Sequence, residues 1–266
     1  MIVPPVLLLA AKLALVAGSV LAASLVSRRL GHAAGGLLAG LPMIADPITG
    51  LLLIDLPAEA VRAVCLATLA CQPALMAYLV SYAHLARRAT WPVCLAVALV
   101  GFFASGALLL ALPLPEWARV ALTLVAPVLG LRAMPAGARA GAAGPVALPR
   151  IELACRIGVA MAVAAGVLWG AQHLRAGLAG LLLAAPITGI VLPSFTLPRH
   201  GAQATGVLLA GFARGQVGFV TFFVVMLVGL PLLPAAACWG LAMLASAGVP
   251  WIWRSTMARA ARRSRG

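Results

Sequence analysis

Charged residues are scarce in this chain, and acidic ones most of all. Of its 266 residues only 9% are charged, with 19 Lys and Arg against 5 Asp and Glu, while 64% are hydrophobic. A typical soluble domain carries about 25% charged residues. The shortage excludes an ordinary soluble domain and indicates an integral membrane protein.

The sequence also lacks the motifs of enzymes and of metal or nucleotide sites. No serine has a histidine and an acid nearby, no His-Glu-x-x-His occurs, and no phosphate-binding loop precedes a predicted helix. The five cysteines lie in apolar segments without Cys-x-x-Cys spacing, which favours neither a disulfide framework nor a zinc site. We therefore expect no enzyme activity, no cofactor and no metal.

The net charge of +14 would suggest nucleic-acid binding in a soluble domain. Here the basic residues are almost all arginines between apolar runs, and they are not interleaved with aromatic residues. Cytoplasmic loops of membrane proteins carry such an excess, which faces anionic lipid. The expected partners are the bilayer, with anionic lipid at its inner face, and a small-molecule or ion substrate, but no nucleic acid.

Nine hydrophobic stretches are candidates for crossing a bilayer, which takes about 20 residues. They are residues 4–26, 34–54, 61–84, 91–112, 117–133, 152–171, 176–196, 204–230 and 235–253. With the N-terminus outside, nine spans leave most loop arginines and the basic tail inside, so the positive-inside rule favours nine over eight. The first span is expected to be retained, because no basic region precedes it. The prediction is an all-α, multi-pass protein of the bacterial inner membrane with a cytoplasmic C-terminus.

A short motif occurs twice. Residues 47–50 read Pro-Ile-Thr-Gly, as do residues 186–189, and the similarity extends to residues 32–50 and 173–189 with two single-residue gaps. Gln72 and Gln216 are 144 residues apart, and so are Cys94 and Cys238. These matches predict a duplication in which spans 1–4 correspond to spans 6–9.

Because span five separates the two copies, the second copy is predicted to be inverted in the membrane, an arrangement typical of transporters. The predicted domains are a first repeat (1–112), a connecting span and cytoplasmic linker (113–150), a second repeat (151–254) and a basic cytoplasmic tail (255–266). The two four-helix repeats are thus joined by one connecting helix.

Both copies of the motif place a proline inside a predicted span, at Pro47 and Pro186. Proline donates no amide hydrogen bond and clashes with the preceding helical turn. The bilayer has no water to satisfy the freed backbone groups, so such breaks are tolerated where they pack in protein or line a cavity. A matched pair of breaks points to the central site of a transporter.

Asp46 precedes the first of these prolines, and an aspartate near the centre of a span costs about 2.5–3.5 kcal/mol on insertion scales. Two interpretations remain open. Asp46 either couples transport to a proton or cation, or binds a cationic substrate; alternatively it caps the helix by accepting amide hydrogen bonds at the break. The second copy has Ala185 at this position, so the two halves differ.

Four uncharged polar residues complete the candidate site: Thr49, Thr188, Gln72 and Gln216. The threonines either offer hydroxyls to a substrate or bond to their own helix backbone. The glutamines either contact substrate or hydrogen-bond across helices, because buried amides need partners.

Arg214 lies inside the eighth span, where a guanidinium needs a carboxylate, an anionic substrate or water. We predict a mid-membrane ion pair with Asp46; the alternative is that Arg214 extends to the inner interface. Lys12 is expected to extend to the outer interface in the same way. Glu152 and Arg156, one helical turn apart, are expected to form an interfacial salt bridge.

The segment that contains the first break reads Gly-Gly-Leu-Leu-Ala-Gly-Leu-Pro-Met-Ile-Ala-Asp-Pro-Ile-Thr-Gly and continues into Leu-Leu-Leu-Ile-Asp-Leu-Pro. It resembles small bacterial four-span membrane proteins of the GlpM-like family and their longer relatives. The resemblance covers residues 31–57 and 173–200. It implies that each half is one four-span unit, and it implies no substrate.

The architecture predicts a secondary transporter or exporter of a small solute with a central site at the two breaks. The alternative is a non-transporting subunit, or a scaffold for another membrane complex. A polar cavity flanked by a buried Asp46–Arg214 pair would favour transport, and a solid core with a large exposed apolar groove would favour the scaffold.

Overall fold

The computed structural model describes residues 5–27, 31–139, 150–173 and 175–248, and over these residues it contains helices and no strand. The helices are α1 (Pro5–Ser27), α2 (Gly31–Gly40), α3 (Ala45–Asp55), α4 (Ala58–Ala70), α5 (Gln72–Leu85), α6 (Trp91–Ala111), α7 (Glu116–Ala133), α8 (Ala136–Arg139), α9 (Arg150–His173), α10 (Ala176–Leu183) and α11 (Ile187–Gly229), followed by a helix over Ala235–Gly248. Residues 140–149 of the predicted linker and the predicted tail 255–266 lie outside the described residues.

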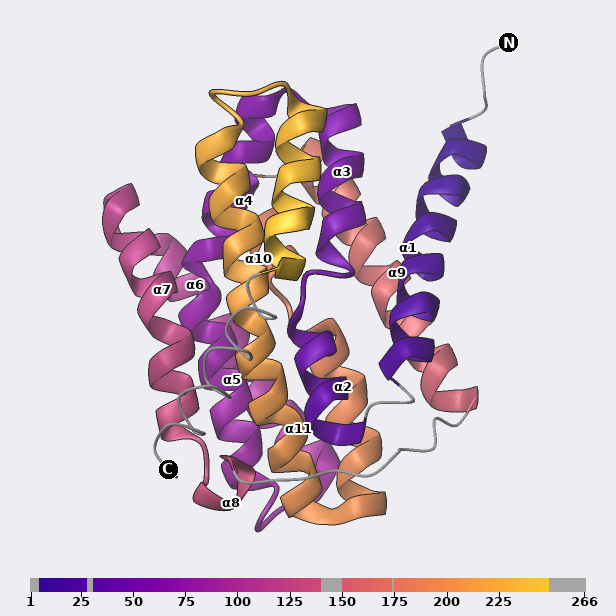
Figure 1. The fold of residues 1–266 in the computed structure, drawn as a ribbon, viewed down its shortest axis with the longest axis vertical. Coiled ribbons are helices and arrows are strands. Elements are labelled where there is room, and N and C mark those ends of the chain that lie inside the picture. The colour runs from indigo at the N-terminus through magenta and orange to yellow at the C-terminus, as the bar shows by residue number, and fades with distance from the viewer. Residues whose placement is uncertain (1–4, 28–30, 140–149, 174, 249–266) are drawn as a thin grey trace, which may run out of the picture.

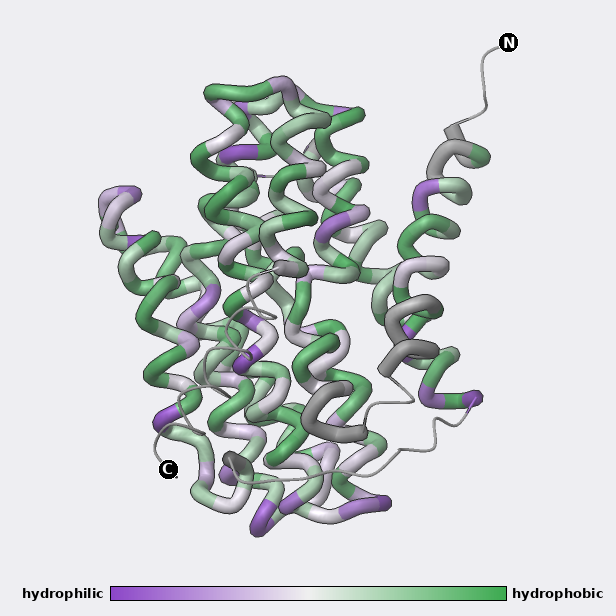
Figure 2. Tube along the Cα trace, in the orientation of Figure 1, coloured by the Kyte–Doolittle hydropathy of each residue, from purple (hydrophilic) through white to green (hydrophobic). Residues whose placement is uncertain are grey.

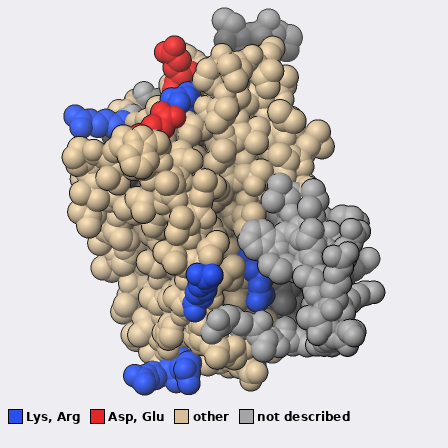
Figure 3. Space-filling view, turned by 60° about the vertical axis from the view of Figure 1, so that its left-hand side comes forward, with Lys and Arg blue, Asp and Glu red and all other residues tan. Residues whose placement is uncertain are grey.

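Five helical segments among the described residues are long and apolar enough to cross a membrane: Gly35–Asp55, Ala58–Leu85, Trp91–Ala111, Arg150–Ala171 and Ala176–Gly229. Hydrophobic residues cover most of the helical length, and hydrophilic ones concentrate towards the helix ends (Figure 2). On the face shown in Figure 3, charged side chains lie near the upper end and in the lower third, with an uncharged band between them. These features fit a membrane-embedded protein.

The long helix α11 contains a sharp reversal. Gly201 has φ 77° and ψ 179°, a backbone conformation essentially restricted to glycine, so α11 comprises a first segment (187–200) and a second segment (202–229). In Figure 1 the first segment runs down to the lower edge and the second runs back up through the bundle. Hydropathy alone separates the same two segments, as spans 176–196 and 204–230.

Helices α2 and α11 cross with their backbones nearly in contact. A Cβ added at Gly36 would lie 2.1 Å from the Leu208 carbonyl oxygen, and one at Gly40 would lie 2.2 Å from that of Phe212. From the other side, a Cβ at Gly215 would lie 2.1 Å from the Leu37 carbonyl oxygen. Only glycine permits this approach, so the glycine spacing in both segments is explained by packing.

The buried side chains form two clusters that meet in the middle of the bundle. One contains residues of α1, α3, α9 and the upper part of α11, and the other contains residues of α5, α6 and the middle of α11. Ile44 and Phe219 belong to the first cluster, and Leu75 and Phe212 to the second. All four line the same cavity, so the junction of the clusters is not completely filled.

Candidate functional site

The two predicted helix breaks lie next to each other in the core. The first is the segment 41–44 between α2 and α3, and the second is the segment 184–186 between α10 and α11. The Thr188 hydroxyl, in the first turn of α11, donates a hydrogen bond of 3.1 Å to the carbonyl of Ala39, near the end of α2. Residues 149 positions apart in the chain are therefore joined where both helices are interrupted.

The prolines act differently at the two breaks. Pro186 directly precedes α11, as expected for a residue that ends one helix and starts the next. Pro47 instead is the third residue of α3, inside its first turn, where a missing amide donor is tolerated. The first interruption thus lies upstream of Pro47, in the segment that contains Pro42. The prediction that Pro47 itself breaks the helix is wrong, because the interruption lies at residues 41–44 and Pro47 is already inside α3.

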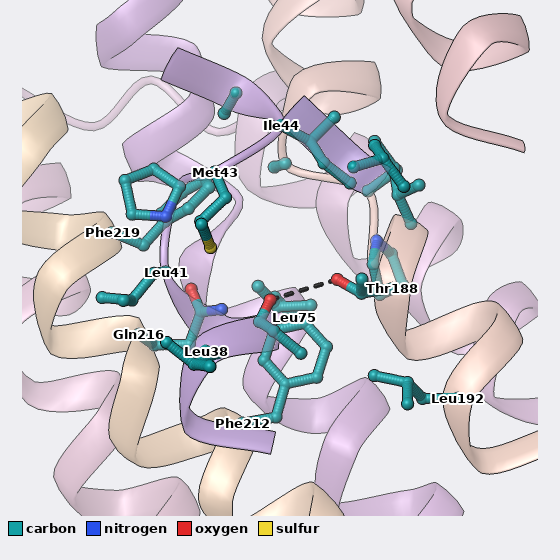
Figure 4. Close-up of a pocket in the computed structure, with 18 of the residues that line it drawn as sticks. Leu38, Leu41, Met43, Ile44, Leu75, Thr188, Leu192, Phe212, Gln216 and Phe219 are labelled. Carbon is teal, nitrogen blue, oxygen red and sulfur yellow. Dashed lines mark hydrogen bonds between the residues drawn. The ribbon is translucent and has the colours of Figure 1, made fainter. Parts of the chain in front are cut away.

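A cavity of about 50 Å³ lies between the breaks. This is room for a few water molecules or a small ion. Its wall combines the end of α2, the start of α3, the end of α10 and the start of α11 with side chains from α5 and the second segment of α11. Figure 4 shows Gln216 and Thr188 on opposite sides of the cavity among mainly apolar neighbours.

The two predicted glutamines contact each other. The Gln72 Nε2 donates to Gln216 Oε1 at 3.0 Å, and the Gln216 Nε2 donates to the carbonyl of Gly40 at 3.1 Å. Gln72 is completely buried, and its Oε1 has no hydrogen-bond partner. Both amides thus hydrogen-bond across helices, which is one of the two interpretations of the sequence, and the Oε1 of Gln72 stays without a donor.

The matched threonines make different bonds. The Thr49 hydroxyl donates to the carbonyl of Ala45, one turn earlier in α3, at 2.7 Å. This is the backbone bond expected of a buried threonine in an apolar helix. Thr188 reaches across to α2 instead, so the two copies of the motif are not equivalent in their contacts.

Asp46 lies in the first turn of α3 and is 8% exposed. Its Oδ1 is buried without a hydrogen-bond partner, and the cap residue Ile44 makes no side-chain cap bond, so the expected capping bonds are not made. Its backbone carbonyl accepts a 3.0 Å hydrogen bond from the indole of Trp239. Ala45, the preceding residue, lines the cavity, as does Ala185, the counterpart of Asp46 in the second copy.

The predicted ion pair between Asp46 and Arg214 is wrong. The ion pairs between described residues are Lys12–Asp55, Arg62–Glu116 and Arg156–Glu152. Arg214 precedes Gly215, which packs against Leu37 of α2, whereas Asp46 belongs to α3.

Two basic residues behave differently from the sequence prediction. Lys12 pairs with Asp55 at the end of α3 at 2.5 Å, with exposed side-chain fractions of 11% and 14%, a partner that the sequence did not indicate. Arg156 pairs with Glu152 as predicted, but both are buried, and Arg156 lines the central cavity. Lys12 and Arg156 are separated by 144 residues, the same offset as Gln72 and Gln216. This shared offset is a sequence signal that relates these two basic residues.

Comparison with known protein families, with curated proteins and with solved structures finds no match. Across the described ranges no three His, Cys, Asp or Glu side chains gather where they could hold a metal ion. The groups that can act near the two breaks are the Oδ1 of Asp46 and the Oε1 of Gln72, each buried without a hydrogen-bond partner, and the buried guanidinium of Arg156.

Proposed function

We propose that the protein is a secondary transporter or exporter of a small solute, with its central site at the two helix breaks. One observation carries the proposal: the two interrupted helices meet around one cavity in the middle of an apolar helical bundle. Broken helices of this kind provide free backbone groups for a substrate or a coupling ion. If the cavity were only a defect in helix packing, there would be no reason for both helix interruptions to line it.

The proposed architecture is nine crossings with two inverted four-helix repeats joined by α7. Helix boundaries support it, because α4 begins at residue 58 and the second segment of α11 at 202, while α5 ends at 85 and α11 at 229, in each case 144 residues apart. Packing supports it too. Gly40 approaches Phe212, and its counterpart Gly180 approaches Thr68, which lies 144 residues before Phe212.

The directions of the helices also agree with the inverted arrangement. Figure 1 shows α2 followed by α3 running upwards and the first segment of α11 running downwards. With four-span units of the GlpM-like type in opposite orientations, the two halves exchange shapes to open the site alternately to either face. We place the protein in the bacterial inner membrane, with the N-terminus outside and the basic C-terminal tail beside anionic lipid.

Asp46 is the proposed coupling residue. An ionised carboxylate without a partner at this depth costs several kcal/mol. A proton or a cation removes that cost, so occupancy of Asp46 is linked to the conformation around the first break. Of the remaining site residues, Thr188 and Gln216 line the cavity, whereas Thr49 in α3 and Gln72 in α5, like Asp46, do not line it. Arg214 lies beside α2 and is not needed for this step.

Solute flux in proteoliposomes tests the proposal. Wild type and Asp46→Asn are compared with and without a pH gradient, using an internal pH dye and a panel of amino acids, carboxylates, sugars and alkylamines. Transport predicts uptake or release by the wild type for one solute class, with gradient dependence lost in Asp46→Asn. Unchanged gradient dependence would remove Asp46 from coupling, and no flux for any class would favour the scaffold function.

A further inference from the structure

Each matched pair of polar residues in the site is divided in the same way between the two halves. Thr188 and Gln216, both in the second half, donate to the last carbonyls of α2, those of Ala39 and Gly40. Their counterparts do not reach α10. Thr49 bonds within its own helix, and Gln72 bonds only to Gln216.

The ends of the two short helices differ in the same sense. Both helix ends have a backbone hydrogen bond of their own: the amide of Leu41 donates to Leu38 at 3.2 Å after α2, and the amide of Ala185 donates to Leu182 at 3.1 Å after α10. The difference lies in the last carbonyls, because those of Ala39 and Gly40 accept side-chain bonds from the other half, whereas the carbonyl of Gly180 accepts the backbone amide of Ala184 at 2.9 Å. Both residue pairs, Thr49/Thr188 and Gln72/Gln216, therefore differ in the same sense: the member in the second half bonds to the helix end of the first half, and its counterpart does not bond to α10.

We infer that Thr49, Gln72, Thr188 and Gln216 form a reciprocal clamp that holds the end of one short helix at a time. This inference rests on the proposed inverted repeat, because exchange of shapes between the halves converts each contact into its counterpart. In the exchanged conformation Gln72 donates to the carbonyl of Gly180 and Thr49 donates to that of Ala179. Thr188 then bonds to its own helix, and Gln216 carries the open acceptor.

The unpartnered Oε1 of Gln72 follows directly from this arrangement. Two amides that share one bond across a pseudo-symmetry axis have two Nε2 and two Oε1 groups. One Nε2 goes to the partner amide and the other to a helix end, so one Oε1 is always left without a protein donor. In this conformation it belongs to Gln72, which is fully buried. The open acceptor moves to the other half when the clamp switches.

The clamp makes these four residues positioning residues of the conformational cycle, not ligands of the solute. Each clamped state has two hydrogen bonds from one half to a helix end of the other half, in addition to the bond between the two amides, and such bonds stabilise helix packing in membranes. Removing one pair of donors is therefore expected to shift the balance between the two conformations by about tenfold or more.

Hydrogen exchange of the protein in lipid nanodiscs, without added solute, tests the clamp. The double variant Thr188→Val/Gln216→Met removes both donors to α2. Exchange in residues 37–46 is expected to rise about tenfold, and exchange in residues 179–188 to fall, because the exchanged conformation gains population. The matched control Thr49→Val/Gln72→Met removes the same chemical groups, and exchange in residues 37–46 should stay within about twofold of wild type.

Equal increases at both helix ends in both variants, or no change in either, would overturn the clamp and leave the four residues as ordinary packing groups. Thr188→Ser in an otherwise native background keeps the hydroxyl that donates to Ala39 and should show wild-type exchange, whereas the single variant Thr188→Val should already raise exchange in residues 37–46. The outcome is separable from the transport proposal: asymmetric exchange without flux removes the transporter, and flux with symmetric exchange removes the clamp.

Discussion

The two helix breaks share the residues Pro-Ile-Thr-Gly but are held by different partners. At the first break the backbone carbonyl of Asp46 accepts a hydrogen bond from Trp239. At the second the carbonyl of Gly189 accepts one of 2.7 Å from the hydroxyl of Tyr78. Position 95, which matches Trp239 at the offset of 144, is leucine, and position 222, which matches Tyr78, is phenylalanine.

The difference shows what a duplicated motif determines and what it does not. Each copy of the motif lies beside an interruption, but the first interruption (41–44) ends before Pro47, whereas the second (184–186) includes Pro186. The side chains that donate to carbonyls near the two breaks, those of Trp239 and Tyr78, come from other helices, where the matched positions carry different residues. Only the first break has a carboxylate beside it, that of Asp46, because the second has Ala185 at the matching position. The two interruptions therefore differ in their chemistry.

The largest effect is expected where the halves touch through backbone. Gly40→Ala would place a Cβ 2.2 Å from the Phe212 carbonyl oxygen, and Gly180→Ala would place one 2.5 Å from the Cβ of Ala67. Overpacking between backbones that cannot separate should cost about 3 kcal/mol in each case. Thermal unfolding in detergent measures this, with Gly101→Ala as the control, because nothing lies within 4 Å of its added Cβ. If Gly180→Ala proved as mild as the control, the two crossings would not be equivalent.

The next largest effect concerns the link between α1 and α3. Lys12→Met leaves the mostly buried carboxylate of Asp55 without its lysine and should destabilise the protein by about 2 kcal/mol, somewhat less than for a fully buried pair. The double variant Lys12→Met/Asp55→Leu removes the stranded charge and should recover most of the loss. A double variant no more stable than the single one would show that the pair contributes through packing alone.

Asp46→Asn is expected to change stability in the opposite direction. Its Oδ1 has no partner, so replacing the carboxylate by an amide of the same shape should stabilise the protein by about 1 kcal/mol at neutral pH. Asp55→Asn, in which a paired carboxylate is lost, should destabilise it. Chemical unfolding in detergent at pH 7 compares the two variants. Destabilisation by Asp46→Asn would mean that the carboxylate has a protein partner.

The smallest effect separates the partners of the two breaks. Tyr78→Phe removes one hydrogen bond to Gly189 and should cost about 1 kcal/mol, with the ring packing unchanged. Trp239→Phe removes the corresponding bond to Asp46 and also the contact of the indole with Gly50, so its cost should be larger. Differential scanning of both variants measures the difference, and a silent Tyr78→Phe would show that the second break needs no external donor.

Much of the helical pattern could be predicted from hydropathy, since a bilayer requires long apolar segments with satisfied backbones. Predicted span 91–112 is helix α6 at Trp91–Ala111, and span 117–133 is α7 at Glu116–Ala133. The position of the first interruption could not be obtained to the residue, because proline is compatible with the first turn of a helix as well as with its disruption.

The contacts of charged residues were harder to predict. A charged side chain in an apolar segment is compatible with an internal partner or with extension to the interface. The choice depends on the relative depth and rotation of helices, which the sequence does not specify. The prediction of an Asp46–Arg214 pair is therefore wrong, and the sequence does not indicate the Lys12–Asp55 pair. The match between Gln72 and Gln216 could be found from the sequence, because the offset of 144 residues also relates Cys94 to Cys238 and so does not depend on composition alone.

The close crossing of α2 and α11 also has a consequence for biosynthesis. The amide of Gln216 bonds to the carbonyl of Gly40, a residue made 176 positions earlier. While the ribosome is still producing the first half, the glycine face of α2 has no helix to receive it, and the last carbonyls of α2 have no side-chain donor. The first half therefore enters the membrane incomplete, and it acquires its final packing only after the last long helix has been inserted.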